Sequence, residues 1–325
     1  MYSIEPYRDE YKNVWDDFVS SAKNATFMFY RDYMEYHRER FEDFSLLIRN
    51  EKGRLAALLP ANREGDTLAC HRGLSYCGFL TGFSMVSEQY LHIFEESMLY
   101  LKKAGFRQLF YKTIPHIYHQ IPSEEDLYAL FLAEARLVRR DLFSTIRQHE
   151  HIHYQKMRLH GIKKARQAGL EVRLTDDYQG FWLLLCEVLQ NCHGVMPVHS
   201  REEMEYLHRL FPKNIKLYCC YENGEMLGGA VIYESKQVAH CQYQAACARG
   251  KACGALDLIY QYLLEEVYRD KAFFDFGNSN EEQGRKLNVG LCRQKEGFGA
   301  RAITHQYYEL DLADFAEGRI TGAFI

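Results

Sequence analysis

The chain has 325 residues, 47% of them hydrophobic and 26% charged, and this composition excludes a disordered or fibrous protein. At roughly 150 residues per domain, the length indicates two domains or one large one. The formal net charge of −4 gives no general attraction to nucleic acid or to an anionic membrane. Function must therefore be inferred from local patterns.

The sequence also bears on the compartment. The N-terminus lacks the basic start and apolar core of a secretory signal. The most apolar stretches of the whole chain, such as Phe181 to Leu185, are far shorter than the roughly 20 residues that a membrane span needs. Ten cysteines in a chain of this length do not make a dense disulfide scaffold. We therefore expect a soluble cytoplasmic protein with reduced thiols.

The first half alternates apolar runs with turn residues. Asn50-Glu51-Lys52-Gly53 is a turn between two such runs, and Gly105 ends an amphipathic pattern. In chain order we expect a helix at Tyr11 to Ala22, strands at Phe44 to Ile48, Leu55 to Pro60 and Thr67 to His71, a helix at Glu88 to Ala104, and a strand at Arg107 to Lys112.

The second half repeats this order. Its hairpin turn, Glu222-Asn223-Gly224-Glu225, carries an Asn-Gly pair. We expect a helix at Tyr178 to Cys192, strands at Ile215 to Tyr221, Met226 to Tyr233 and Val238 to Tyr243, a glycine-containing loop, a helix at Ala255 to Arg269, and strands at Ala272 to Phe276 and Arg301 to Leu310. The pattern predicts an α+β (mixed α/β) fold built twice, with domains at 1–144 and 145–325.

A basic stretch, Thr145 to Arg173, joins the halves. It carries seven lysines or arginines against two glutamates. Charge runs of this kind usually form the solvated face of a helix. The functional alternative is an anion-binding surface at the mouth of a cleft between the domains.

The segment Arg249-Gly-Lys-Ala-Cys-Gly-Ala255 lies between a predicted strand and a predicted helix. Small residues let the backbone approach a phosphate, and the first N–H groups of the helix point toward it. Arg249 and Lys251 add positive charge. The structural alternative is an ordinary strand–helix connection that contains two glycines.

This segment resembles the pyrophosphate-binding motif of the GCN5-related N-acetyltransferases, Arg/Gln-x-x-Gly-x-Gly/Ala. Arg249 and Gly254 match its ends, whereas Ala252 stands where the first glycine is usual. Three further segments are similar to the C-terminal half of Fem-type peptidoglycan aminoacyltransferases and related acyltransferases. They are Gly254-Ala-Leu-Asp-Leu-Ile, Phe273-Phe-Asp-Phe-Gly-Asn-Ser-Asn280 and Leu287-Asn-Val-Gly-Leu-Cys-Arg-Gln-Lys-Glu-Gly-Phe-Gly299.

The resemblance implies two tandem acetyltransferase-like domains, each with a central, mostly antiparallel sheet flanked by helices. It implies an acyl-CoA donor held by Arg249, Gly250, Lys251, Ala252 and Gly254. Classical Fem enzymes often insert a long coiled-coil arm for tRNA, and this sequence has no heptad pair of that length. Aminoacyl-tRNA is therefore the alternative donor.

The resemblance also points to the strand His240 to Gln244, where a backbone N–H would stabilise the oxyanion that forms during acyl transfer. His240 or Tyr243 would relay protons. The structural alternative for His240 is a hydrogen-bonded histidine within a sheet.

Polar residues gather at the end of the next strand. Asp275, Asn278, Ser279 and Glu282 are expected to hold the acceptor amine, since open sheets bind ligands at strand ends. Asp275 would orient that amine. Asn278 or Ser279 could instead cap a helix that begins near Glu281.

Three further features carry their own alternatives. Lys295 precedes the final strand and is expected to bind a phosphate or carboxylate of donor or acceptor, or to be a surface lysine. His149 and His153 have a spacing that can bind metal on a helix, but no partner follows, so we predict no metal site. Cys253 could carry an acyl group if a helix N-terminus lowered its pKa.

The resemblance implies an N-acyltransferase that moves an acyl group from acyl-CoA to an amine of a sugar, peptide or cell-envelope precursor. The acyl-CoA and the amine would be its small-molecule partners, with no DNA. The alternatives are aminoacyl transfer from aminoacyl-tRNA to a peptidoglycan precursor, and a non-catalytic binding protein that retains the fold.

Overall fold

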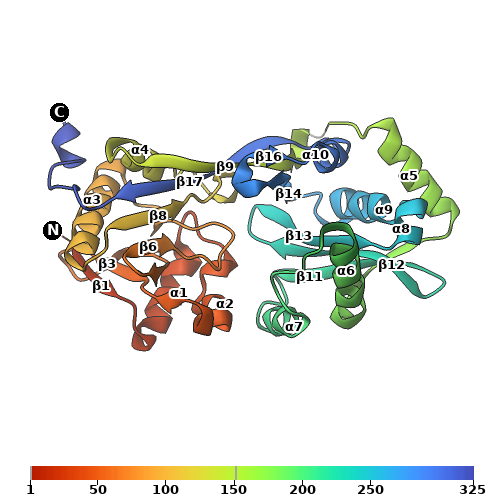
Figure 1. Cartoon of the computed structure of the whole chain (residues 1–325), viewed down its shortest axis with the longest axis horizontal. Helices are drawn as coiled ribbons and strands as arrows, with labels where there is room; N and C mark the ends of the chain where they lie inside the picture. The colour runs from red at the N-terminus through yellow and green to blue at the C-terminus, as the bar shows by residue number, and fades with distance from the viewer. Residues whose placement is uncertain (1, 151) are drawn as a thin grey trace. The chain divides into compact units, whose positions relative to one another are not determined.

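The computed structural model describes residues 2–150 and 152–325, which form two compact units (Figure 1). The first unit comprises 1–141, 283–285 and 304–325, and the second comprises 142–282 and 286–303. Strand β17 (Arg301–Asp311) therefore begins in the second unit and ends in the first. Both units combine sheets with helices, so the predicted α+β class is confirmed. The division into functional halves at residue 144 stays a prediction.

The first unit contains two sheets. One has the strand order β1-β3-β4-β7, and the other contains β17-β8-β6-β5-β2. Its strands are β1 (Ser3–Pro6), β2 (Glu42–Asp43), β3 (Leu46–Arg49), β4 (Leu55–Leu59), β5 (Ala61–Glu64), β6 (Thr67–Cys70), β7 (Leu80–Thr81) and β8 (Gln108–Lys112), with β9 (Arg136–Arg147) leading out of it. Its α-helices are α1 (Lys12–Ser21), α2 (Arg31–Met34), α3 (Ser87–Lys103) and α4 (Glu125–Leu132).

The second unit has one main sheet with the strand order β10-β11-β12-β13-β14-β9 and a small hairpin, β15-β16. Its strands are β10 (Glu171–Thr175), β11 (Ile215–Glu222), β12 (Glu225–Glu234), β13 (Val238–Ala246), β14 (Phe273–Asn278), β15 (Asn280–Glu281) and β16 (Lys286–Leu287). Its α-helices are α5 (Lys156–Gln167), α6 (Tyr178–His193), α7 (Arg201–Leu210), α8 (Ala248–Cys253), α9 (Ala255–Tyr262) and α10 (Val289–Glu296). Among the described residues, no helix combines the length and apolar composition needed to cross a bilayer.

The repeat predicted from the sequence is present in its main features. Each unit has an antiparallel hairpin, β3–β4 or β11–β12. Each also has a parallel pair of strands joined through a helix: β6 with β8, and β13 with β14. The copies differ after the hairpin, because in the first unit the chain turns at Pro60 into β5, which pairs with β6 in the other sheet.

Two elements differ from the sequence-based expectation. No α-helix begins near Glu281. Glu282 and Gln283 have positive φ angles of 49° and 54°, and the chain forms a distorted 3₁₀ turn, Glu282–Gly284, within the β15–β16 hairpin instead. The helix begins later as α10, where the Asn288 side chain accepts a hydrogen bond from the Leu291 N–H at 3.0 Å. The predicted helix 255–269 ends as α-helix at Tyr262 and continues as a π-helical turn, Leu263–Val267.

The main sheet of the second unit is covered on both faces. On one face, Phe181 of α6 packs against Cys219 and Gly229, where a Cβ added to Gly229 would lie 2.6 Å from the Phe181 ring. The other face carries a buried cluster with α9 that includes Cys220, Ala230, Ile232, Ala239, Cys241, Ile259, Tyr260, Phe274 and Phe276. Figure 1 shows α6 and α9 on opposite sides of these strands. Successive side chains of a strand therefore point alternately toward α6 and toward α9.

Substituting Gly250 with alanine should destabilise the second unit. Gly250 lies in α8, and a Cβ added there would lie 2.1 Å from the Leu227 carbonyl oxygen of β12. Backbone must move to relieve this overlap, which costs about 2–3 kcal/mol of unfolding free energy. Chemical denaturation would measure it, with Gly290→Ala in α10 as the control, because an added Cβ there meets its nearest atom at 3.6 Å. Equal stability of the two variants would contradict the prediction.

Candidate functional site

The candidate site lies where two parallel strands part. Strands β13 and β14 pair in parallel from Val238↔Phe273 to His240↔Asp275, and the recorded pairing ends there although both strands continue. At this last pair, the His240 Nδ1 atom lies 2.9 Å from the Asp275 Oδ2 atom. The structure thus joins two of the three residues that the sequence analysis proposed as catalytic.

Asp275 is fully buried, and a buried carboxylate must be paired and hydrogen-bonded. Its Oδ1 atom accepts hydrogen bonds from the Thr145 hydroxyl at 3.2 Å and from the Gly277 N–H at 2.9 Å. Gly277 has a φ of +71°, and a Cβ there would meet the His240 ring at 3.1 Å. Glycine thus allows the turn that brings its N–H to the carboxylate and leaves space for the imidazole.

These contacts fix the orientation of the imidazole. With Nδ1 bound to Asp275, the Nε2 atom of His240 is the ring nitrogen left to exchange a proton. The His240 side chain is 17% exposed, so it is half-buried and still accessible. A histidine held by a buried carboxylate is an arrangement suited to general base catalysis.

Lys295 of α10 supports the end of β14. Its ammonium group is buried and donates hydrogen bonds to the carbonyl oxygens of Gly277 at 3.1 Å and Asn278 at 2.5 Å. Burial lowers the pKa of Lys295 to about 8, and the nearby charge of Asp275 opposes this shift. Sequence analysis proposed Lys295 as a ligand for phosphate or carboxylate, whereas the structure commits its ammonium group to two backbone carbonyls.

A β-bulge brings Tyr243 to the same face as His240. Ile232 pairs with Cys241 and Val231 with Tyr243, so Gln242 is the extra residue. Cys241 and Gln244 both contact Tyr260 of α9, whereas Tyr243 contacts Trp182 of α6. In a regular strand without a bulge, Tyr243 would lie two residues after Cys241 and would point toward α9 like Cys241. The bulge therefore places His240 and Tyr243 together on the α6 face.

Tyr243 is held by a second histidine, in the segment after α6. Its hydroxyl lies 2.6 Å from the His199 Nδ1 atom and accepts a hydrogen bond from the His199 N–H at 3.3 Å. The Trp182 Nε1–H donates to the His199 carbonyl at 3.2 Å. Burial raises the pKa of Tyr243 to about 12, so the phenol stays protonated at neutral pH.

The predicted glycine loop is mostly helical. Residues 248–253 form α8, and Gly254 joins it to α9 with a φ of +82°. A Cβ on Gly254 would lie 2.4 Å from the Gly161 carbonyl oxygen of α5, so this glycine, like Gly250, permits close packing. The Arg249 guanidinium forms an ion pair with Glu222 at 2.6 Å. Lys251 and Ala252 are exposed on α8.

The residues proposed to bind the acceptor are spread out. The Asn278 side chain is exposed, and Ser279 is buried with no recorded hydrogen bond to its hydroxyl. Glu282 is exposed and pairs with Lys286 at 3.4 Å. From this strand end, the Gly277 N–H donates to Asp275, and the carbonyls of Gly277 and Asn278 accept from Lys295.

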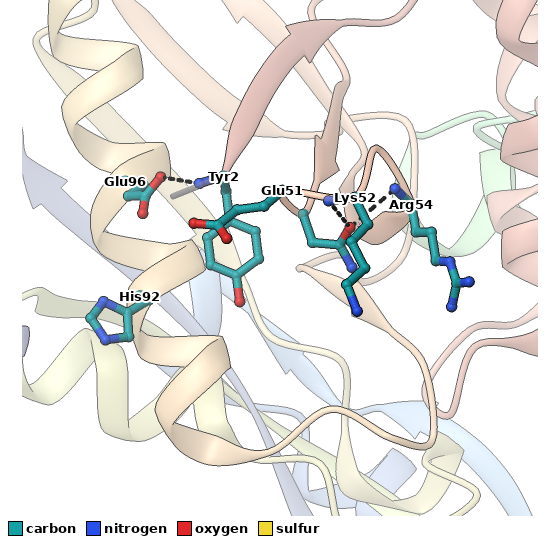
Figure 2. A pocket seen from close by; sticks show the side chains of 7 residues that line it. Tyr2, Glu51, Lys52, Arg54, His92 and Glu96 are labelled. Atoms are coloured by element: carbon teal, nitrogen blue, oxygen red, sulfur yellow. Dashed lines mark hydrogen bonds between the residues drawn. The ribbon is translucent and has the colours of Figure 1, made fainter.

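Two other features remain separate from this site. His149 lies in a short 3₁₀ turn (Gln148–Glu150), and His151, between the two proposed histidines, lies outside the described residues. Within the described ranges, no group of three potential metal ligands is found. Figure 2 shows a pocket of about 460 Å³ in the first unit, beside the β3–β4 turn and α3, and none of the predicted site residues lines it.

Three of the cations in the basic stretch are paired. Arg147 pairs with Glu150 at 3.0 Å, Arg158 with Asp257 at 2.6 Å, and Arg173 with Glu171. The lysines of α5 are exposed. This part of the chain thus combines a paired surface with a solvated helix face.

Comparison with known proteins shows the fold. No protein-family model matches the sequence, and no curated protein matches it. Among solved structures, FemX is similar with a TM-score of 0.66 at 10% identity, covering 94% of this chain and 97% of that one. L-PGS from Bacillus licheniformis has a TM-score of 0.59 at 11% identity over 96% and 94% of the two chains. A tandem GNAT protein from the clavulanic acid biosynthesis pathway has 0.53 at 10% identity over 96% and 99%.

These similarities confirm the tandem acetyltransferase-like fold that the sequence resemblance implied. At such low identity they establish the arrangement of the chain and leave its substrates open. The chemistry must therefore be argued from this chain's own residues.

Four contributors to the site were not predicted from the sequence. Thr145 lies 130 residues from its partner Asp275, so no local pattern connects them. His199 likewise contacts Tyr243 from 44 residues away. The bulge at Gln242 has no signature in the alternating sequence around it. Only Gly277 carried a signal, since Asp-Phe-Gly is a sequence in which an aspartate can accept from the N–H two residues on.

Proposed function

We propose that the chain is an N-acyltransferase that moves an acyl group from acyl-CoA to an amine acceptor. The observation that carries this proposal is the His240–Asp275 pair at the point where β13 and β14 part. The tandem acetyltransferase-like fold supports the reaction class. The acceptor would be an amine of a sugar, peptide or cell-envelope precursor.

In the proposed reaction, His240 accepts a proton at Nε2 while the acceptor nitrogen attacks the thioester carbonyl. Asp275 keeps the imidazole in the tautomer with hydrogen on Nδ1 and stabilises the imidazolium that forms. The carbon–sulfur bond then breaks, the amide forms, and coenzyme A leaves as its thiolate, which takes up a proton.

Two groups on β13 would assist. Beyond His240, this strand is not recorded as paired with β14, so backbone N–H groups near the Gln242 bulge can donate to the oxyanion of the tetrahedral intermediate. The protonated phenol of Tyr243 lies on the same face and can donate a proton. Cys253 is half-buried in α8, and the structure gives it no role in this scheme.

The donor is the less constrained part of the proposal. Arg249 is already paired with Glu222, so a CoA phosphate would have to compete with a carboxylate for it. Because this pairing weakens the case for a CoA phosphate at Arg249, aminoacyl-tRNA is kept as the second candidate donor. The two donors differ in charge, and tRNA binding should fall steeply with salt because it releases many counterions.

Charge reversal tests the donor site. With Lys251→Glu or Arg249→Glu, binding of acetyl-CoA and longer acyl-CoAs should weaken about tenfold, because a positive charge near the phosphates becomes negative. Isothermal calorimetry measures this, with Lys213→Glu, an exposed lysine between α7 and β11, as the matched control.

The outcomes separate the three candidates. Micromolar binding lost in the two variants and kept in the control supports acyl-CoA. Binding of aminoacyl-tRNA in place of any thioester would replace the donor. If neither acyl-CoA nor aminoacyl-tRNA binds, the result supports the third candidate, a non-catalytic binding protein that retains the fold.

A further inference from the structure

The segment between α6 and α7 exposes an unusual run of apolar side chains. Gly194 ends α6 in the left-handed conformation, and Val195, Met196, Pro197 and Val198 follow. Val195 is 50% exposed, Met196 61% and Val198 79%. We call Val195–Val198 the apolar edge. Three apolar side chains exposed within four residues form a local apolar surface, and contiguous apolar surfaces of this kind are where binding sites are found.

The apolar edge is anchored rather than free. The next residue, His199, is buried and bound to the Tyr243 hydroxyl through both its Nδ1 atom and its N–H. Its carbonyl accepts from the Trp182 indole. Ser200 then begins α7 with a capping box to Glu203. The chain thus holds this run in place by hydrogen bonds on its C-terminal side.

The anchor places the edge on the catalytic face. Tyr243 lies on the α6 face of β13 because of the bulge at Gln242, and His240 points to that same face. Three residues of strand span roughly 10 Å. A molecule with its amine at His240 would therefore carry its next few carbon atoms past Tyr243 to the apolar edge.

We propose that the acceptor is an amphiphilic amine, whose hydrocarbon portion binds the apolar edge while its amino group lies at His240. This inference rests on the proposed function and deepens it by naming the acceptor class. The four side chains of the edge are apolar, so they complement an alkyl chain and not a phosphate or sugar hydroxyl, and the His199 and Tyr243 groups that anchor the edge are bonded to each other.

A homologous series of alkylamines tests this. With acetyl-CoA as donor, kcat/KM should rise about two- to fourfold for each added methylene from ethylamine to octylamine, as expected for burial of a CH₂ group. In the variant V195S/M196S/V198S this slope should flatten. Leu174→Ser on β10, which removes an exposed apolar side chain elsewhere in the same unit, is the matched control and should keep the slope. Val198→Ser alone should flatten it partly, which guards against misfolding of the triple variant.

A binding measurement separates this inference from the reaction. Octylamine affinity is measured by calorimetry without donor and should exceed butylamine affinity in the wild type and not in the triple variant. Such binding without any acetyl transfer would support the apolar edge as the acceptor-binding surface and would count against acyl-CoA as the donor. Transfer with a flat chain-length dependence would overturn the inference and keep the reaction. Absence of both chain-length-dependent binding and acetyl transfer would overturn the inference as well. Self-association of the wild type that the triple variant loses would also overturn it, since a second copy of the chain would then occupy the apolar edge.

Discussion

Replacing His240 with asparagine should lower the rate of acyl transfer by about 10²–10⁴-fold, the range expected for loss of a general base. The amine would then have to lose its proton to water, while the donor site that we propose on α8 is left unchanged. Initial rates at saturating donor measure this, and calorimetry on the same variant should give unchanged acyl-CoA affinity. The loss should shrink at high pH, where more of the amine is already neutral.

Asp275→Asn should act through the same imidazole. An asparagine amide can present its N–H to Nδ1 and so favour the tautomer with hydrogen on Nε2, which cannot accept the proton. The rate should fall by a similar factor, and the double variant should be little worse than either single one, because the two residues act as a unit.

The chain provides a matched control for this pair. The Nε2 atom of His208 in α7 lies 3.2 Å from the Asp176 Oδ1 atom, and its Nδ1–H donates to the Ile215 carbonyl at 2.8 Å, so it is a second histidine–aspartate pair in the same unit. His208→Asn should leave the rate within about twofold of the wild type. A comparable loss in both histidine variants, or none in either, would remove His240 from the reaction.

Much of the site geometry followed from sequence patterns. The strands around His240 and Asp275 were predicted from alternation and turn signals, and their parallel pairing follows from the helix between them. The contact between His240 and Asp275 also requires the register that pairs them directly, and this register was not predicted from the sequence.

The remaining contacts depend on geometry that alternation does not encode. A strand with period two puts Tyr243 on the same face as Cys241, and only the inserted Gln242 reverses this. Gly250 and Gly254 resembled a phosphate-binding loop. A glycine that lets a ligand approach the backbone and a glycine that lets two elements pack closely cannot be told apart in a sequence.

The partners of charged residues were equally hidden. Arg249 meets Glu222 from 27 positions away in the chain, across a hairpin turn whose exact length sets the register. Lys295 was predicted to bind a phosphate or carboxylate or to be a surface lysine, and lysines are indeed mostly exposed. Its burial follows from the packing of α10 against the end of β14, which no local pattern describes.

Removing the Lys295 ammonium group should destabilise the second unit. Lys295→Met leaves the carbonyls of Gly277 and Asn278 without their donor and takes a positive charge from the neighbourhood of the buried Asp275. Unsatisfied buried groups of this kind cost about 2–4 kcal/mol of unfolding free energy at neutral pH. Denaturant titration measures the loss, and Lys213→Met, an exposed lysine, should change the stability by less than about 0.5 kcal/mol.

The same lysine should make stability depend on pH in a defined direction. Its pKa is about 8 in the folded chain against 10.5 for the free side chain, because burial disfavours the ammonium form. Between these values the unfolded chain binds more protons than the folded chain, so unfolding free energy rises with pH across the window. The stability difference between wild type and Lys295→Met should widen by about 3 kcal/mol from pH 8 to pH 10.5. Lys112 of the first unit, whose pKa burial also lowers to about 8, is present in both proteins and cancels in this difference. A difference that stays constant across the window would mean that Lys295 keeps an ordinary pKa, and its amine would then have to be more accessible to water than the contacts with Gly277 and Asn278 allow.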